Sequence, residues 1–198
     1  MKNLFTTDDA AMLLIDHQVG TEKLVQNISK DHLHANVRAL ARTAVETGMP
    51  LVLTSSEEDN FQGELYPFLK DIAPDAYENR IKRPGTVDAW TYDDYKSAVE
   101  ATGRKRLIMA GLTNDVCTVF PTISALQDGY DVQIVVDGGG SPTEQADQIA
   151  VARMRANGVT ITSTNQIMAE LATDWSSDTG KAIQTIMYEE ILKPLVEG

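Results

Sequence analysis

Short apolar runs alternate with helix-like stretches along the whole chain of 198 residues. The runs have the length of strands, and one such as AMLLI lacks polar alternation, which is typical of parallel strands buried on both faces. The stretches between them place apolar residues three and four positions apart, as one face of a helix requires. Six strands are expected, at 10–16, 50–55, 77–83, 106–112, 131–137 and 159–164.

Helices are expected between these strands, at 29–48, 64–72, 91–103, 118–129 and 141–158, and again in the C-terminal segment 165–198. Gly48 marks the end of the first helix, because glycine readily adopts the left-handed conformation of a C-cap. Thr91 and Ser141 are expected to cap the helices that follow them, and Pro142 suits the first helical position.

This alternation, with short connections, predicts a three-layer α/β/α fold of Rossmann-like type, in which helices cover both faces of a six-stranded parallel sheet. No linker, repeat or low-complexity tract divides the chain, so a single domain is expected over 1–198. In such sheets functional residues gather at the carboxyl ends of the strands. The residues at the predicted strand ends are therefore the first candidates for chemistry.

Cys117 is the only cysteine and follows the fourth strand, where a helix is expected to begin. The partial charge and free N–H groups of a helix N-terminus favour the thiolate, which would make this residue a nucleophile. Alternatively it is a small buried hydrophobe, since cysteine is among the most buried residue types.

Asp16 ends the first strand, at the expected centre of the sheet, where an unpaired charge is costly. It could take the thiol proton and return it to a leaving group, or it could be a structural residue that caps a helix or pairs with a cation. A cation at the end of the third strand, either Lys82 or Arg83, would complete a nucleophile, a base and an electrostatic partner.

Three stretches carry a resemblance to a known family: LLIDHQVG (13–20), RPGTVDAW (83–90) and GLTNDVC (111–117). In this order the chain resembles the isochorismatase-like cysteine hydrolase family, and within it the YcaC-type branch. The resemblance implies the isochorismatase-like hydrolase fold and an Asp–Lys–Cys type of triad that hydrolyses amide-type bonds through an acyl-enzyme. It makes Cys117 the nucleophile and Asp16 the general base.

The third member of the triad departs from the family pattern, because counting back from Ala89-Trp90 places Pro84 at the common lysine spacing. Adjacent strand residues point to opposite faces, so one of Lys82 and Arg83 enters the site. Arg83 is favoured because the chain resembles the YcaC-type branch in its Arg-Pro-Gly sequence at this place. An arginine would hold its charge permanently and could not shuttle protons.

The resemblance also implies a cis peptide bond at Leu112–Thr113 and an oxyanion hole made by the backbone N–H groups of Thr113 and Cys117. Asn114 stands where the family commonly has threonine. The expected substrate-binding residues are Trp90, Thr54 and Asn114, and Phe61 is a further candidate for the pocket wall.

The expected substrate is a small molecule, and no cofactor or metal ion is expected. The three histidines are not spaced for a shared site, and LTSSEEDNFQG replaces the metal-binding stretch that the nicotinamidase branch carries after its second strand. A net charge of −12 would repel nucleic acid. No apolar run approaches the roughly 20 residues that cross a bilayer. A single cysteine and no signal peptide suggest a reducing cytoplasm.

The leading functional prediction is a cofactor-free hydrolase of small carbon–nitrogen bonds, whose substrate the sequence does not specify. The alternatives are an oligomeric binding or assembly protein without turnover and a thiol redox protein. The C-terminal helices, from about 165 to 198, are expected in subunit packing, because an apolar stripe there has no sheet left to cover. Relatives of the YcaC type suggest an octamer-like ring. The stripe consists of Ile183, Ile186, Met187 and Ile191.

Overall fold

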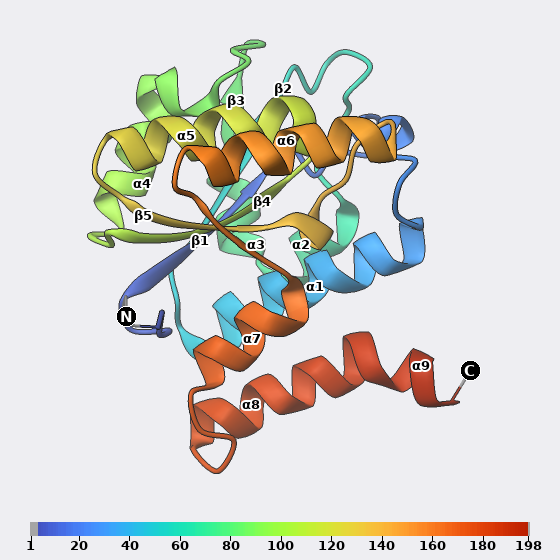
Figure 1. Ribbon diagram of the computed structural model, residues 1–198, viewed down its shortest axis with the longest axis vertical. Helices are drawn as coiled ribbons and strands as arrows, with labels where there is room; N and C mark the ends of the chain where they lie inside the picture. Colours follow the sequence, from blue (N-terminus) through green and yellow to red (C-terminus); the bar gives the residue numbers. More distant parts are fainter. Residues whose placement is uncertain (1–3, 198) are drawn as a thin grey trace.

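A computed structural model describes residues 4–197 of the chain (Figure 1). Its sheet has six parallel strands in the order β3-β2-β1-β4-β5-β6. The predicted three-layer α/β/α fold is confirmed. The strands are β1 Ala10–Ile15, β2 Leu51–Ser56, β3 Ile81–Arg83, β4 Arg106–Gly111, β5 Asp131–Val135 and β6 Thr160–Thr162.

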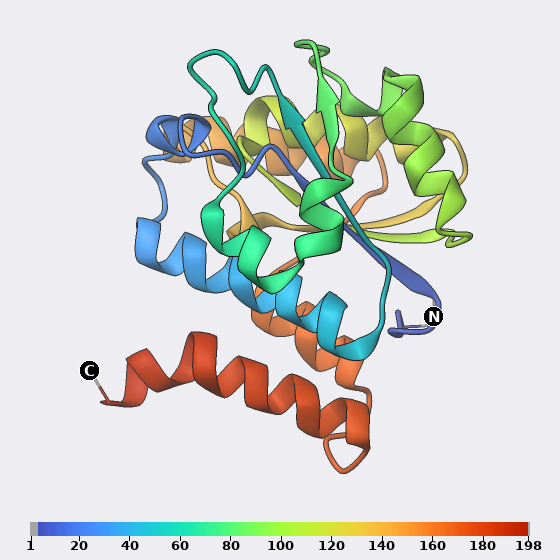
Figure 2. The same cartoon turned by 180° about the vertical axis from the view of Figure 1, so that it is seen from behind.

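Helices cover both faces of the sheet (Figures 1 and 2). On one face lie α1 Lys30–Thr47, α2 Pro67–Ile72, α3 Pro74–Glu78 and α7 Thr164–Ala172. On the other lie α4 Asp93–Ala101, α5 Val119–Gln127 and α6 Glu144–Ala156. The chain ends in α8 Asp178–Met187, a π-helical turn at Tyr188–Leu192 and α9 Lys193–Glu197. Among residues 4–197, no helix is long and apolar enough to cross a membrane.

Strand β1 explains why the sheet is buried on both faces. All six of its residues are inaccessible to solvent. Met12 and Leu14 belong to the core beneath α1, whereas Leu13 and Ile15 belong to the core beneath α4, α5 and α6. Each such side chain contributes roughly 1.5–3 kcal/mol when it is fully buried. A strand without polar alternation therefore stabilises two cores at once.

The strand order reverses between β1 and β4, since the chain builds outward from β1 to β2 and β3, and then from β4 to β5 and β6. The loops that leave β1 and β4 diverge at this point, and a crevice at their carboxyl ends is the usual binding place in such sheets. Asp16 follows β1 and Cys117 follows β4. The topology thus brings the two predicted catalytic residues to the same end of neighbouring strands.

Three predicted helix starts are wrong by a few residues, and one of them is that of α2, which begins at Pro67 and not at residue 64. Helix α6 begins at Glu144, because the Thr143 hydroxyl accepts from the Ala146 N–H, while Ser141 donates its hydroxyl to Asp147. Helix α4 begins at Asp93, because the preceding residues, including Thr91, form a separate 3₁₀ turn at Ala89–Thr91. The predicted C-cap of the first helix, Gly48, is confirmed, and Ser29 caps its N-terminus.

The C-terminal apolar stripe does not remain uncovered, which corrects the sequence-based argument for subunit packing. Helix α8 folds back as an outer layer against α1 and α7 (Figures 1 and 2). Ile183 and Ile186 are fully buried there, Met187 is 7% exposed, and Ile191 packs against the same core. The stripe therefore completes the core of its own chain.

Candidate active site

Asp16 occupies the turn that leaves β1. Its φ of 56° is left-handed, a conformation that aspartate and asparagine tolerate better than most residues. Its N–H donates to the Thr54 carbonyl at 2.9 Å, which continues the pairing of β1 with β2 by one residue. The residue is 1% exposed. The backbone thus ends the strand and fixes a carboxylate inside the protein.

The Arg83 guanidinium, which is equally buried, satisfies this carboxylate. Its Nη2 atom contacts both carboxylate oxygens of Asp16, with 2.5 Å to Oδ2. Its Nε atom donates to the Thr54 hydroxyl at 3.0 Å, and Nη1 donates to the Thr86 carbonyl at 2.6 Å. Three separate partners therefore fix the guanidinium, and a pair with such partners can offset the cost of burying two charges.

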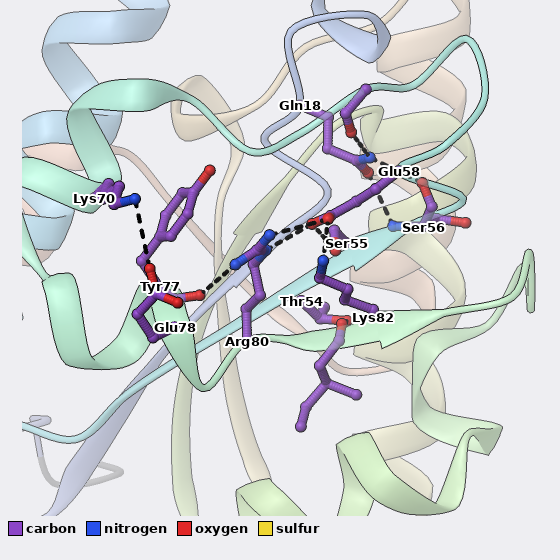
Figure 3. A network of polar contacts seen from close by, with 12 residues as sticks. Gln18, Thr54, Ser55, Ser56, Glu58, Lys70, Tyr77, Glu78, Arg80 and Lys82 are labelled. Atoms are coloured by element: carbon purple, nitrogen blue, oxygen red, sulfur yellow. Dashed lines mark hydrogen bonds and ion pairs between the residues drawn. The ribbon is translucent and has the colours of Figure 1, made fainter.

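Lys82, the other candidate for the cation, lies on the opposite face of β3. Its ammonium is 2.9 Å from Glu58, its side chain is 60% exposed, and Arg80 holds the same carboxylate (Figure 3). The pKa of Glu58 falls to about 2, because the hydrogen bonds from Arg80, Lys82 and Ser55 outweigh the effect of its partial burial. The structure brings Arg83, and not Lys82, to Asp16.

Cys117 lies in a single π-helical turn, Asn114–Thr118, that precedes α5. The peptide bond between Leu112 and Thr113, just before this turn, is cis. The turn continues directly into α5, so the cysteine lies between the last residue of β4 and the first full turn of the helix. Cys117 is half-buried and has a free thiol.

The Cys117 thiol lies beside the Asp16 carboxylate and the backbone of Thr113, and all three residues line one pocket. Burial raises the pKa of the thiol well above its ordinary value, the adjacent carboxylate raises it further, and Arg83 acts in the opposite direction. This corrects the expectation of a thiolate stabilised by the helix end. These influences favour a neutral thiol beside the Asp16 carboxyl group.

Burial also raises the pKa of the Asp16 carboxyl, and the charge and hydrogen bonds of Arg83 act against that rise. Next to it, His17 is buried and its Nε2 atom lies 2.7 Å from the Gly138 carbonyl oxygen. Burial lowers the pKa of His17 to about 4, so its ring is neutral near pH 7. Residues 4–197 contain no group of three or more His, Cys, Asp or Glu side chains placed to hold a metal ion.

Asn114 anchors the turn that carries Cys117, and it is fully buried and lies outside the lining of the pocket beside that cysteine. Its amide nitrogen donates to the Val136 carbonyl and to Asp147, both at 2.9 Å. Its backbone N–H donates to the Gly140 carbonyl at 2.8 Å, and the Ser141 hydroxyl joins the same Asp147 carboxylate. The residue that stands where the family commonly has threonine thus ties the turn to β5 and α6.

Trp90 is a core residue, which corrects its predicted contact with substrate. It is 3% exposed, and its indole N–H donates to Asp128 at 2.8 Å. Its ring meets Tyr95 and Tyr130 edge to face.

Thr54 is also internal, which corrects the third substrate contact. Its hydroxyl donates to the Ile81 carbonyl at 2.7 Å and accepts from Arg83. The residue positions the guanidinium and lies outside the pocket that Cys117 lines.

That pocket has a volume of about 160 Å³ and opens beside Cys117, Asp16 and Thr113. Phe61 lines it, as expected. The sequence analysis missed six other lining residues, of which Gln18 lies within the quoted stretch LLIDHQVG and could have been found there. The six are Gln18, Thr21, Leu24, Ser56, Gln62 and Val116.

Comparison with known proteins identifies the family. The Isochorismatase domain model matches residues 10–166. The probable hydrolase YcaC of Escherichia coli is 40% identical over 171 residues, which are 86% of this chain and 81% of that protein. Its crystal structure, described as an octameric hydrolase of unknown specificity, matches with a TM-score of 0.91 and 38% identity over 96% of this chain and 92% of that one.

Two further structures place this match in context. YcaC from Pseudomonas aeruginosa, with hexane-2,5-diol and covalent acrylamide, matches with a TM-score of 0.93 and 38% identity over 100% of this chain and 97% of that one. The nicotinamidase PncA of Bacillus subtilis matches with a TM-score of 0.63 over 78% of this chain and 99% of that one, at 15% identity, a likeness of fold alone. By its domain match and its full-length likeness to YcaC proteins, the chain belongs to the isochorismatase family of hydrolases.

Proposed function

We propose that the protein is a cysteine hydrolase that cleaves a small amide-type carbon–nitrogen bond through an acyl-enzyme on Cys117. The observation that carries the proposal is the position of Cys117 beside the buried Asp16 carboxylate, which is also held by Arg83. A nucleophile, a base within hydrogen-bond reach and a group that orients the base are the parts that covalent catalysis requires.

In the first step Asp16 takes the thiol proton while the sulfur attacks the carbonyl carbon. The carbonyl oxygen becomes an oxyanion that accepts from the N–H groups of Thr113 and Cys117, and such donors supply roughly 3–4 kcal/mol of transition-state stabilisation. The carbon–nitrogen bond then breaks, and Asp16 returns its proton to the leaving amine. Arg83 keeps the carboxylate oriented throughout and exchanges no proton.

In the second step water attacks the carbonyl carbon of the thioester, and Asp16 takes the proton of that water. The carbon–sulfur bond breaks, the acid is released, and the proton passes from Asp16 to the sulfur. The raised pKa of the thiol supports this cycle, because the sulfur is neutral at rest and charged only during attack. The covalent acrylamide in the P. aeruginosa YcaC structure supports a nucleophile in this fold.

Loss of turnover on alkylation or substitution of Cys117 tests this function. Incubation with small amides should release ammonia, and intact-mass spectrometry should detect an acyl adduct in the unmodified protein. Neither should occur in Cys117→Ala or after treatment with iodoacetamide. Rapid alkylation with no turnover of any amide would instead favour the binding or assembly protein, and turnover in Cys117→Ala would exclude this cysteine as the nucleophile.

We also propose that the protein forms a symmetric homo-oligomer, in the reducing cytoplasm that suits a free cysteine. Because the apolar stripe is buried within its own chain, the surface that supports an oligomer is the outer side of the C-terminal helices. There Trp175 is 44%, Tyr188 45% and Leu192 38% exposed, around a groove of about 590 Å³. Contiguous apolar surface of this kind marks interfaces.

Light scattering at micromolar protein should report a multiple of 21.7 kDa, with eight copies if the assembly matches that described for E. coli YcaC. Leu192→Glu should lower that mass, because it places a charge in the apolar groove. Ile149→Glu, a matched change at a residue that is 62% exposed on α6, should leave the mass unchanged. A mass near 21.7 kDa for the unmodified protein would refute the oligomer.

A further inference from the structure

The pocket beside Cys117 has a reactive floor and an apolar outer wall. Asp16, Thr113 and Cys117 form the floor. Leu24, Phe61 and Val116 also line it, and they are 45%, 58% and 42% exposed, so their side chains present apolar surface at the entrance. They come from three separate segments: the loop after β1, the loop after β2 and the turn Asn114–Thr118 that carries Cys117. Three segments thus place apolar side chains around one opening.

The side-chain amides in this pocket are held by the protein. The Gln18 amide nitrogen donates to the Ser56 carbonyl at 2.8 Å and the Gly63 carbonyl at 2.5 Å, and its oxygen accepts from the Ser56 N–H (Figure 3). The Gln62 amide nitrogen donates to Glu57 at 3.1 Å. These amides fix the loop that carries Phe61, and their contacts within the protein reduce what they can offer a charged substrate group.

The charges around the pocket disfavour a second charged group on the substrate. Among the described residues that line it, Asp16 is the only charged one, and Arg83 occupies its carboxylate. Lys23 stands over the ring of Phe61, with its ammonium 5.9 Å from the ring centroid, and lies outside the lining. A carboxylate here would lose its hydration without gaining a cation, and an ammonium would lose its hydration against the apolar wall.

The size of the pocket limits the ligand. Its volume is about 160 Å³. An apolar cavity of roughly 150 Å³ accommodates a six-carbon ring. A carboxamide group must occupy the floor beside Cys117, so the remainder of the molecule is a short substituent that rests against the wall.

We infer that the substrate is a small uncharged carboxamide whose acyl group ends in an apolar substituent, seated against Leu24, Phe61 and Val116. This inference rests on the proposed hydrolysis and names its substrate class. Water adds to the carbonyl carbon, the carbon–nitrogen bond breaks, and ammonia and a carboxylic acid leave. The acid ionises to a carboxylate, which the Asp16 charge and the apolar wall bind poorly, so the same features that select the neutral substrate favour release of its product.

Two pairs of isosteric amides test the inference with the full-length protein. In the first pair, isovaleramide ends in a branched alkyl group and malonamate ends in a carboxylate. In the second pair, butyramide ends in a methyl group and β-alaninamide ends in an ammonium. We expect kcat/KM to favour the neutral member of each pair by about 100-fold or more, since an unpaired charge in such a site costs several kcal/mol. A preference for either charged member would overturn the inference.

Binding to Cys117→Ala, followed by saturation-transfer NMR, separates this inference from the proposed hydrolysis. If the neutral amides bind and none is hydrolysed by the unmodified protein, the ligand class stands and the hydrolysis fails. If malonamate is hydrolysed best, the hydrolysis stands and the ligand class fails. Binding of no amide, together with no turnover, overturns both.

A charge placed at the wall should change the preference. In Leu24→Lys an ammonium stands at the entrance, so the kcat/KM of malonamate relative to isovaleramide should rise about tenfold. Val45→Lys makes the same change of charge near the end of α1, which leads into the start of β2 at the opposite end of the sheet. It should leave the ratio within about twofold, because exposed charges at long range are screened. An equal rise in both variants would show that net charge, and not the pocket wall, sets the preference.

Discussion

Asp16→Asn is expected to lower the turnover of small amides by roughly 10²–10⁴-fold, the usual contribution of a general base. The same change is expected to lower, not raise, the pKa of the Cys117 thiol. The Asp16 carboxylate raises that pKa by its negative charge, and without it Arg83 would face the sulfur with no counter-charge. The variant thus gains thiolate and loses the base.

The two effects are measured separately. Iodoacetamide alkylation as a function of pH reports the thiol pKa, and steady-state ammonia release reports turnover. Asparagine suits the left-handed φ of 56° nearly as well as aspartate, so the turn after β1 should survive the change. Turnover of Asp16→Asn within about threefold of the unmodified protein would exclude Asp16 as the base.

The sequence predicted that Asp16 and Cys117 lie close together, because the parallel sheet brings the carboxyl ends of its strands to one edge. Asp16 and Cys117 follow neighbouring strands whose paired residues include Ile15 and Gly111. The alternation of side chains along a strand says only that Lys82 and Arg83 point to opposite faces of the sheet. It does not say which of the two faces the site. The pairing of Ser56 with Arg83, visible in the folded sheet, decides which of them is buried.

The pocket wall was harder to predict, because it comes from loops without periodicity. Leu24 and Val116 are far apart in the sequence, and no periodic pattern marks them as neighbours. Trp90 misled for the opposite reason, since a large aromatic residue beside a family motif is as often core as pocket. The direction of the thiol pKa was also missed, because a helix end is a local feature whereas burial depends on the whole fold.

The Asp16–Arg83 pair is expected to dominate stability as well as chemistry. Arg83→Met should cost roughly 3–5 kcal/mol near pH 8, because it leaves a buried carboxylate without its cation. Lys82→Met, the matched change at the next residue, should cost less than about 1 kcal/mol, since Lys82 is 60% exposed. Urea unfolding followed by circular dichroism measures both. Equal losses of unfolding free energy in the two variants would show that the buried ion pair stabilises the fold no more than an exposed one.

The cost of Arg83→Met should also depend on pH, and the sign follows from burial. Burial already raises the pKa of Asp16, and removing Arg83 removes an influence that lowers it. The folded variant then holds a proton that the unfolded chain, with an aspartate pKa of about 3.9, has released. Its free energy of unfolding should therefore fall as the pH rises from about 4 through the raised pKa of the folded state. In Asp16→Asn/Arg83→Met neither charge remains, so this pH dependence should vanish. Near pH 8 the double variant should lose less unfolding free energy than the sum of the losses in the two single variants. A pH dependence that persists in the double variant would place its origin in another group.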